Sequence, residues 1–498
     1  MSDQKPLSTG SEWTFEQLKA YDETIGCLAK QFRLDTYPTQ IEIINSEQMI
    51  DAYASVGMPL MYHHWSFGKH FLGSLQNYQR GRMGLAYEIV INSNPCIAYL
   101  MEENTMAMQA LVIAHACYGH NSFFKGNYLF QQWTDADAII DYLLFARNYI
   151  SQCEEKYGVD KIEELLDACH ALMNQGVNRY KRPQPVSAAE EEALAKEREE
   201  YIQRNLNDLW RTIPAKEEPK SKAKQRFPEV PEENLLYFIE KSAPLLENWQ
   251  REIIRIVRKI AQYFYPQRQT QVMNEGWATF WHYTLTHELY KQGFINDGYM
   301  LEILHSHTSV VFQPDFDDPR YTGINPYTLG FNIYRDIRRI CENPTPEDRE
   351  WFPDLADSDW LDTLHFAMHN FKDESFILQY LSPKVMRDMH LFCIEDNEVN
   401  SFLEVNSIHD EPDYRTLRQS LAAQYNLGNT EPNIQVYNVD IRGDRSLTLI
   451  HTMHEGRPLE PGSAQEIIKH LHYLWGFDIC LKSVDQWGTE KEVYALSG

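Results

Sequence analysis

Two histidines five residues apart stand in an otherwise apolar segment, where both rings could bind one metal ion. The segment reads Ala114-His115-Ala-Cys-Tyr-Gly-His120. A buried imidazole needs a partner, because an unpaired buried polar group costs about 1–3 kcal/mol. Metal ligation would satisfy both rings, and so would ordinary hydrogen bonds within the protein. On an ideal α-helix, residues five apart are separated by about 140° around the axis. Sharing one ion therefore requires the helix to end or bulge near Gly119.

A glutamate far along the chain offers a third ligand. The segment Asn274-Glu275-Gly-Trp-Ala278 resembles, letter for letter, the Asn-Glu-Gly-x-Ala segment from which gluzincin metallopeptidases take a carboxylate ligand for zinc. Two imidazoles and one distant carboxylate form an N,N,O set that suits zinc, or another divalent ion if further ligands join. The alternative is that Glu275 only stabilises the N-terminus of its own helix through the helix dipole. We expect a divalent-metal site, with zinc as the ion, built from His115, His120 and Glu275.

The residue after His115 argues against ordinary peptidase chemistry. Position 116 is Ala, where the HExxH motif of zinc peptidases carries the glutamate that acts as general base. Either another carboxylate takes this role, or the metal is structural, or the chemistry differs. Tyr118 and His282 are the residues that we expect near the reacting group. The acids that could replace the missing base are Glu88, Glu103 and Glu302.

Other polar clusters have simpler explanations. The segment Tyr62-His-His-Trp-Ser-Phe-Gly-Lys69 gathers two histidines and three aromatic residues, which form either a pocket lining or a stacked surface cluster. Cys117 has no orienting acid nearby in the sequence, so a thiol nucleophile is not expected. His305 and His307 alternate along the chain, so at most one of them is expected to face inward.

Composition excludes several classes of function. The 498 residues include 46 Lys and Arg against 72 Asp and Glu, which gives a formal net charge of −26. Such a field repels phosphate backbones and anionic lipids, so a general role in binding nucleic acid or membrane surfaces is disfavoured. No window approaches the ~20 apolar residues of a transmembrane helix, and no apolar run like that of a signal peptide follows Met1. The eight cysteines form no CxxC pair, which argues for a reducing compartment. We expect an acidic, soluble, cytoplasmic protein without membrane insertion.

Helical periodicity dominates the chain up to about residue 395. The segment 97–118 is apolar on most faces and is expected to be a buried helix. Apolar residues over 245–264 predict an amphipathic helix that stops before Pro266. Within the helix predicted over 327–342, Arg335 and Asp336 are expected to form an ion pair that fixes the helix. Further helices are predicted over 12–35, 134–157, 159–180, 271–292 and 297–310, and short strands over 41–44 and 87–92.

The last hundred residues switch to the period of strands. Ser463 and Glu466 predict a capping box at the start of a helix that ends at Gly476. The strands predicted around this helix cover 434–441, 447–449, 479–484 and 492–496, and the first two are expected to form a hairpin. This part of the chain is therefore predicted to be a small α+β domain.

The chain is expected to divide into four segments. Residues 1–182 form an N-terminal helical domain with short β segments and the histidine helix, and residues 233–398 form a second helical domain that carries Glu275. Between them, residues 183–232 are highly charged and rich in proline, which predicts a solvated linker, with a regulatory docking arm as the alternative. Residues 399–498 form the α+β domain. The expected fold class is mainly α: a helical, metallopeptidase-like (gluzincin-like) body with a small C-terminal α+β domain.

Several long motifs together resemble the stage V sporulation protein R (SpoVR) family and span most of residues 15–395. Where the family pattern is His-x-Asp-Phe-Phe-Lys-Asn-Asn, this chain reads His120-Asn-Ser-Phe-Phe-Lys-Gly-Asn127, so no acid is available at positions 121 and 122. Besides the histidine helix, the matching segments are Tyr62–Lys69, Tyr263–Gln269, Val272–Tyr283 and Asn325–Phe331.

The resemblance implies a cytoplasmic bacterial protein linked to spore cortex formation in spore formers. In bacteria that never sporulate, it implies an association with a stress-related serine protein kinase and a von Willebrand A-type partner. The family supplies no reaction. Two hypotheses follow: a divalent-metal hydrolase that cleaves amide bonds, or a non-enzymatic regulatory scaffold in a stress or envelope pathway with the metal absent or structural.

Overall fold

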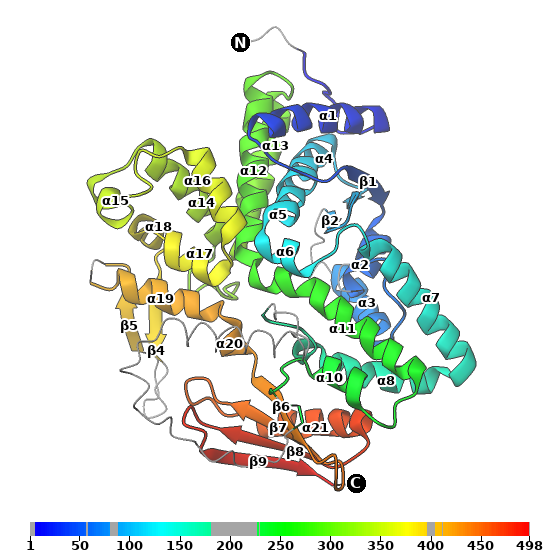
Figure 1. Ribbon diagram of the computed structural model, residues 1–498. Coiled ribbons are helices and arrows are strands. Elements are labelled where there is room, and N and C mark those ends of the chain that lie inside the picture. The colour runs from blue at the N-terminus through cyan, green and yellow to red at the C-terminus, as the bar shows by residue number, and fades with distance from the viewer. Residues whose placement is uncertain are drawn as a thin grey trace, which may run out of the picture. The chain divides into compact units, whose positions relative to one another are not determined.

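The computed structural model describes residues 5–55, 58–79, 88–180, 227–228, 230–395, 404–410 and 412–497. The chain divides into two compact units, each discontinuous in sequence (Figure 1). Unit 1 comprises residues 1–170 and 252–432, and unit 2 comprises residues 171–251 and 433–498. Within the described ranges, no helix combines the length and the apolar character needed to cross a lipid bilayer.

Unit 1 is mainly helical, and α12 runs through its middle (Figure 1). The elements that pack directly on α12 (Gln271–Lys291) include α14 (Pro326–Glu342) and the π-helix η1 (Ile113–His120). One connected hydrophobic cluster runs from Leu18 to Ala422, so these elements share a single core. The other helices that lie wholly in the described part of unit 1 are α1 (Phe15–Gln31), α2 (Ser46–Ala54), α3 (Trp65–Gln79), α4 (Met106–Val112), α5 (Asn121–Gly126), α6 (Tyr128–Trp133), α7 (Ile139–Tyr157), α13 (Asp297–Val310), α15 (Pro346–Trp351), α16 (Trp360–Asn370), α17 (Asp373–Tyr380), α18 (Pro383–Asp388), α19 (Tyr414–Gln424) and α20 (Leu427–Thr430).

Small residues let the central helices approach each other closely. A Cβ atom added to Gly119 of η1 would lie 2.7 Å from the Cα atom of Ala278 on α12. On α14, a Cβ atom added to Gly330 would lie 2.7 Å from the Cα atom of Gly276, also on α12. Because such distances leave no room for a side chain, Gly276 and Ala278 fix α12 against both of its neighbours.

A small sheet positions one further acidic residue. The central strand β3 (Cys96–Met101) pairs in parallel with β1 (Thr39–Ile44) and antiparallel with β2 (Glu88–Ile91). Glu88 begins β2 opposite Leu100. Because β2 packs against η1, this register brings the first residue of the strand toward the two histidines. A separate antiparallel pair in unit 1 is formed by β4 (Phe392–Glu395) and β5 (Glu404–Ile408).

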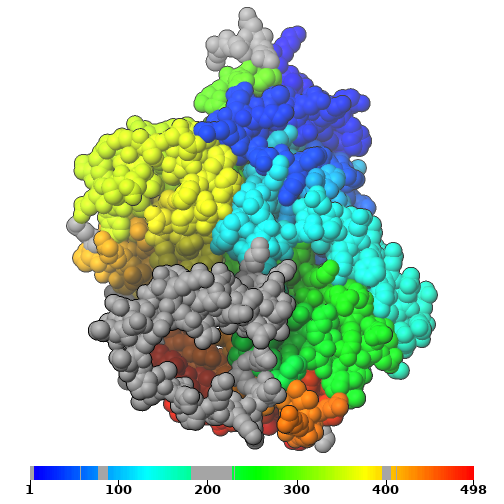
Figure 2. All heavy atoms as spheres, in the orientation of Figure 1, coloured from blue at the N-terminus to red at the C-terminus, as the bar shows by residue number. Residues whose placement is uncertain are grey.

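The C-terminal helices of unit 1 contact the segment that follows η1. The side-chain amide of Asn127 donates to the carbonyl oxygens of Met368 (2.7 Å) and Phe371 (3.0 Å). In Figure 2 the cyan residues that follow η1 accordingly lie directly beside the yellow C-terminal helices. Segments almost 250 positions apart in sequence are thus joined around the histidine segment.

Unit 2 contains the small sheet domain. Its strands follow the order β6 (Asn433–Val439), β7 (Leu447–Thr452), β8 (Ile479–Val484) and β9 (Glu490–Leu496), with antiparallel, parallel and antiparallel pairing. Alternate residues of β7 and β8 are buried, and α21 (Pro461–Trp475) packs on β8 and β9. Among the described residues of unit 2, the other elements that lie wholly within it are α10 (Leu235–Ser242) and η2 (Met173–Gln175). Two of the boundaries between the units fall within α8 (Val159–Ala171) and α11 (Asn248–Gln269), and the third directly precedes β6.

The main α-helices and the C-terminal α+β domain are confirmed, but some boundaries differ from the predictions. Residues 97–101 form strand β3 rather than helix, because they pair with two neighbouring strands. The helix predicted to stop before Pro266 continues to Gln269. The C-terminal helix is capped by Glu460, which accepts backbone hydrogen bonds from Gly462 and Ser463, so the predicted capping box at Ser463 was wrong.

The two compact units do not follow the four predicted segments. Residues 1–170 and 252–432 form one unit because their helices share a hydrophobic core. The small sheet domain begins at Asn433 rather than at 399, since α19 still packs on α17 of unit 1. Most of the predicted linker 183–232 lies outside the described residues.

Candidate metal centre

The π-helix aligns the two histidines. In η1, the backbone N–H of Asn121 donates to the carbonyl of Ala116, five residues earlier. Residues five apart in a π-helix therefore share a face, as residues four apart do in an α-helix. The ring centroids of His115 and His120 lie 4.6 Å apart as a result. The bulge that the five-residue spacing requires is present, and it covers the whole segment rather than Gly119 alone.

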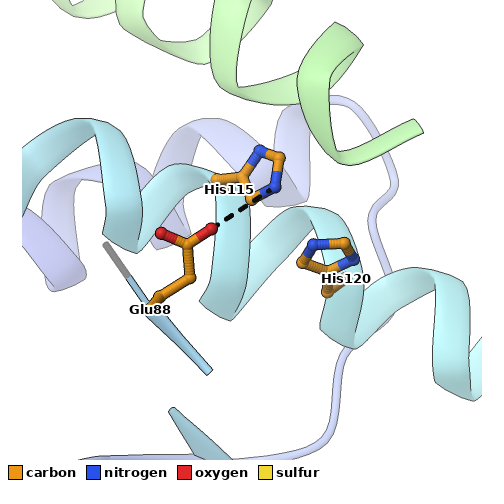
Figure 3. A group of neighbouring side chains, drawn as sticks. All are labelled: Glu88, His115 and His120. Atoms are coloured by element: carbon orange, nitrogen blue, oxygen red, sulfur yellow. Dashed lines mark ion pairs between the residues drawn. The ribbon is translucent and has the colours of Figure 1, made fainter. Parts of the chain in front are cut away.

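Two carboxylates face these rings from other elements. The Nε2 atom of His115 lies 3.6 Å from a Glu88 oxygen and 4.0 Å from a Glu275 oxygen. The same Glu275 oxygen lies 3.6 Å from the Nε2 atom of His120. Figure 3 shows the Glu88 carboxylate directed at His115 from β2, with His120 beside them. Ligand atoms of Glu88, His115 and His120 all lie within 4.8 Å of one another.

The Nδ1 atom of each ring contacts another polar side chain. The Nδ1 atom of His120 lies 2.9 Å from the amide oxygen of Asn274. Because that oxygen can only accept, Nδ1 of His120 carries the proton and Nε2 keeps its lone pair. The Nδ1 atom of His115 lies 2.8 Å from Nδ1 of His282, and Nε2 of His282 lies 2.9 Å from Nδ1 of His307. Three buried imidazoles thus form a chain that leads away from the carboxylates.

Burial sets the charges at this site. It raises the pKa of Glu88 to about 8, with a smaller contribution from the neighbouring Glu275 carboxylate. It holds the pKa of His115 well below its usual range, helped by the nearby His120 and His282 rings. Burial likewise lowers the pKa of His282, and it lowers the pKa of His307 to about 4. The imidazoles of this chain are therefore neutral at pH 7, which is the state that ligates metals.

Glu275 is fixed at the start of α12. Both oxygens of the buried Asp373 accept backbone N–H groups of α12, from Val272 and Met273, at 2.9 Å each. These bonds satisfy donors that the first turn of a helix leaves free. Burial nevertheless raises the pKa of Asp373 to about 7. The Oε2 atom of Glu275 is buried and has no hydrogen-bond partner among the described residues.

Tyr327 was not predicted from the sequence. Burial is the main reason why its pKa is raised, and the nearby Glu275 and Glu88 carboxylates raise it further. Its ring lies nearly parallel to that of His115, with centroids 6.5 Å apart. Tyr327 follows the helix-starting Asn325-Pro326 pair, a local signal of helix position but not of proximity to the histidines.

The structure brings together His115, His120 and Glu275, the three residues predicted as ligands, and adds Glu88. Of the other two acids, Glu103 accepts the backbone N–H of Ser46, and Glu302 accepts the hydroxyl of Thr105. Neither of them has a contact with the two histidines among the described residues.

The two residues predicted near the reacting group do not lie on the side of His115 that faces the carboxylates. The hydroxyl of Tyr118 donates to Asp22 of α1, at 2.8 Å to its carbonyl and 2.9 Å to its carboxylate. Three residues along a π-helix correspond to well over half a turn, so Tyr118 leaves the face that His115 occupies. His282 stands behind His115 and contacts its Nδ1 atom, not the side that faces the carboxylates.

The remaining clusters have structural partners. In the 62–69 segment, the Tyr62 hydroxyl bonds His170, and His64 lies 3.2 Å from both Glu163 and Asp167. His307 is buried and His305 is exposed, as their alternation predicted.

The ion pair expected between Arg335 and Asp336 is not formed. Asp336 instead pairs with Arg339, at 2.6 Å. The reason is that neighbouring side chains on a helix point in different directions, whereas residues three apart face each other.

Comparison with known proteins identifies the family. Residues 12–430 match the model described as SpoVR like protein, and residues 432–486 match the SpoVR-like C-terminal domain. The chain belongs to the SpoVR family. It is 63% identical over 484 residues to the uncharacterized protein YcgB of Escherichia coli strain K12, a match that covers 97% of this chain and 95% of that protein. No solved structure matches the chain.

Proposed function

We propose that the protein is a divalent-metal hydrolase that cleaves amide bonds, with zinc bound by His115, His120 and Glu275. One observation supports this most directly: two imidazole Nε2 atoms and two carboxylates from three separate elements converge at 3.6–4.0 Å. Ligands that share an ion at about 2 Å each lie within about 4 Å of one another.

The residues present fit a cation. Glu275 has a buried oxygen without a hydrogen-bond partner among the described residues, which is costly unless a positive charge approaches it. Asn274 holds the tautomer of His120 that leaves Nε2 free. His282 stands in the same relation to His115, and such partners orient metal-binding imidazoles in known sites.

Glu88 is the proposed general base. A bound zinc ion would act as a Lewis acid that polarises a carbonyl and makes a water molecule more acidic. A base is then needed to accept the proton of the water, and position 116 lacks the usual glutamate. Glu88 stands at the same cluster, 3.6 Å from Nε2 of His115. With a pKa of about 8 before an ion binds, its carboxyl is poised near neutral pH for proton transfer.

Tyr327 is proposed to position Glu275. The Glu275 carboxylate lies close enough to raise the pKa of Tyr327, and the Tyr327 ring lies nearly parallel to that of His115. The overall scheme resembles that of gluzincins in its ligand types, but a π-helix with a five-residue spacing replaces the HExxH helix. We place this activity in the cytoplasm, in stress response or in cell-envelope or spore-cortex formation, as the family resemblance suggests.

Metal analysis of the purified protein tests the proposal. Protein prepared without chelators should contain one equivalent of zinc, and His115→Ala and Glu275→Ala should each lose it. Glu103→Ala serves as the matched control, since it removes an acid outside the cluster and should keep the metal. Glu88→Gln should retain zinc but lower the rate of peptide hydrolysis by about 10²–10⁴-fold, as loss of a general base does.

Two other outcomes would change or end the hydrolase proposal. Loss of zinc in Glu88→Gln would make Glu88 a fourth ligand and the site a closed, structural one. Wild-type protein that binds no divalent ion would end the hydrolase proposal. The proposal would then be the alternative, a non-catalytic regulatory scaffold that works with a serine protein kinase and a von Willebrand A-type partner.

A further inference from the structure

A small cavity in unit 1 is lined by arginines although the protein as a whole is strongly acidic. The cavity has a volume of about 260 Å³, and its lining includes Arg335, Arg338 and Arg339 of α14. At spacings of three and four residues, these side chains share one face of the helix. The acid in the lining is Glu342, so the lining carries a net positive charge in a chain of net charge −26.

Two of these arginines have structural partners. Arg339 is held by both oxygens of Asp348, at 2.6 and 2.7 Å, and by Asp336. Arg338 pairs with Glu342 at 3.1 Å, and its guanidinium lies 4.3 Å from the ring centroid of Trp360. These contacts account for the positions of the Arg338 and Arg339 side chains.

The position of the Arg335 side chain is not accounted for by such contacts. In the described part of the chain, no acid and no hydrogen-bond acceptor contacts its guanidinium, and its side chain is exposed at the cavity. Tyr283 and Asn343 also line the cavity and bring a hydroxyl and an amide. An unpaired guanidinium next to neutral donors is the arrangement that binds planar or tetrahedral oxyanions.

We propose that this cavity, which we call the α14 arginine pocket, binds a small oxyanion of the phosphate type through Arg335. The volume admits a free phosphate or the phosphate group of a small metabolite. Acidic partners already neutralise Arg338 and Arg339, so Arg335 supplies both the free positive charge and the forked pair of donors. The proposal does not depend on the metal centre, because none of the proposed ligands lines the pocket.

Titration with inorganic phosphate tests the pocket. Binding is measured by calorimetry on chelator-treated wild-type protein in a buffer without other oxyanions, so that phosphate cannot bind through an ion at the metal centre. We expect saturable binding in the millimolar range or tighter, weakened by added salt through screening. Arg335→Ala should weaken it about tenfold or more, and Arg335→Lys, which keeps the charge but not the fork, should fall between the two.

Arg442→Ala is the matched control. Arg442 is an exposed arginine of unit 2 that likewise has no ion pair within the described residues, so its loss changes net charge equally. It should leave phosphate binding unchanged. Absence of saturable phosphate binding in the wild type, or equal weakening by the two Ala variants, would overturn the proposal. Thermal melts that match the wild type show that each variant is folded.

Discussion

His115 presents its two nitrogens to different environments. Nε2 faces the Glu88 and Glu275 carboxylates, whereas Nδ1 contacts His282. In a chain of neutral imidazoles, each ring donates at one nitrogen and accepts at the other. If His115 donates toward His282, the direction of every bond up to His307 is set, and the lone pair of His115 points at the carboxylates. A cation bound at the proposed site would select this direction.

The pKa of Glu88 predicts how metal affinity depends on pH. Without an ion, Glu88 holds its proton below about pH 8, and a cation must displace that proton to bind beside it. Zinc affinity should therefore rise with pH, by up to about tenfold per unit, and level off above pH 8. His115 adds nothing to this slope, because its lowered pKa keeps it neutral. Competition with a chromophoric chelator measures the slope, and an equal slope in Glu88→Gln would contradict the assignment.

The imidazole chain predicts a role for His282 in metal binding. His282→Phe removes the partner of the His115 Nδ1 atom with little change in volume, so that ring loses its fixed orientation. Zinc affinity should fall about 10–100-fold, as it does when such partners are removed elsewhere. His305→Ala, which changes an exposed histidine of α13, should have no effect. Unchanged affinity in His282→Phe would show that the chain does not orient the ligand.

At the scale of elements, the site depends on the spacing between α12 and its neighbours. Gly276 and Ala278 flank Trp277 and face α14 and η1 respectively. The five-residue segment from Asn274 to Ala278 therefore combines a contact to His120, the carboxylate and two close helix contacts. This explains in physical terms why the segment carries small residues beside the functional ones.

Substitution of Gly330 tests this packing. In Gly330→Ala the new Cβ atom would lie 2.7 Å from the Cα atom of Gly276. This neighbour is a backbone atom, which cannot move aside as a flexible side chain can. We expect a loss of at least about 1–3 kcal/mol in the free energy of unfolding, the usual range for overpacking. Gly73→Ala on α3 is the control, since nothing lies within 4 Å of its added Cβ atom. Because alanine favours helix, that variant should gain about 0.5–1 kcal/mol. Denaturant unfolding compares them, and equal stability of both variants would refute the close-contact argument.

At the scale of the whole molecule, charge and function are distributed unevenly. The net charge of −26 would repel anions from most of the surface. Both proposed sites lie in unit 1: a cluster of acids and imidazoles suited to a cation, and the α14 arginine pocket suited to an anion. The β6–β9 sheet lies in unit 2, where no comparable metal-ligand group occurs among the described residues.

The sequence alone determined the long helices, the C-terminal hairpin and the three proposed ligands. These features follow from local rules: apolar residues repeat with the period of the helix or strand, and His115, His120 and Glu275 stand in recognisable segments. The family was also evident from such segments, and the match over residues 12–430 confirmed it.

Only the tertiary structure decided how these parts meet. The π-helix is not visible as a sequence period, and Gly119 within it packs closely against Ala278 of α12. Glu88 reaches the site through the register of β2 on β3, and Tyr327 through the crossing of α14 and α12. Such contacts join residues far apart in the sequence, and their distances are fixed by the shared core rather than by local pattern.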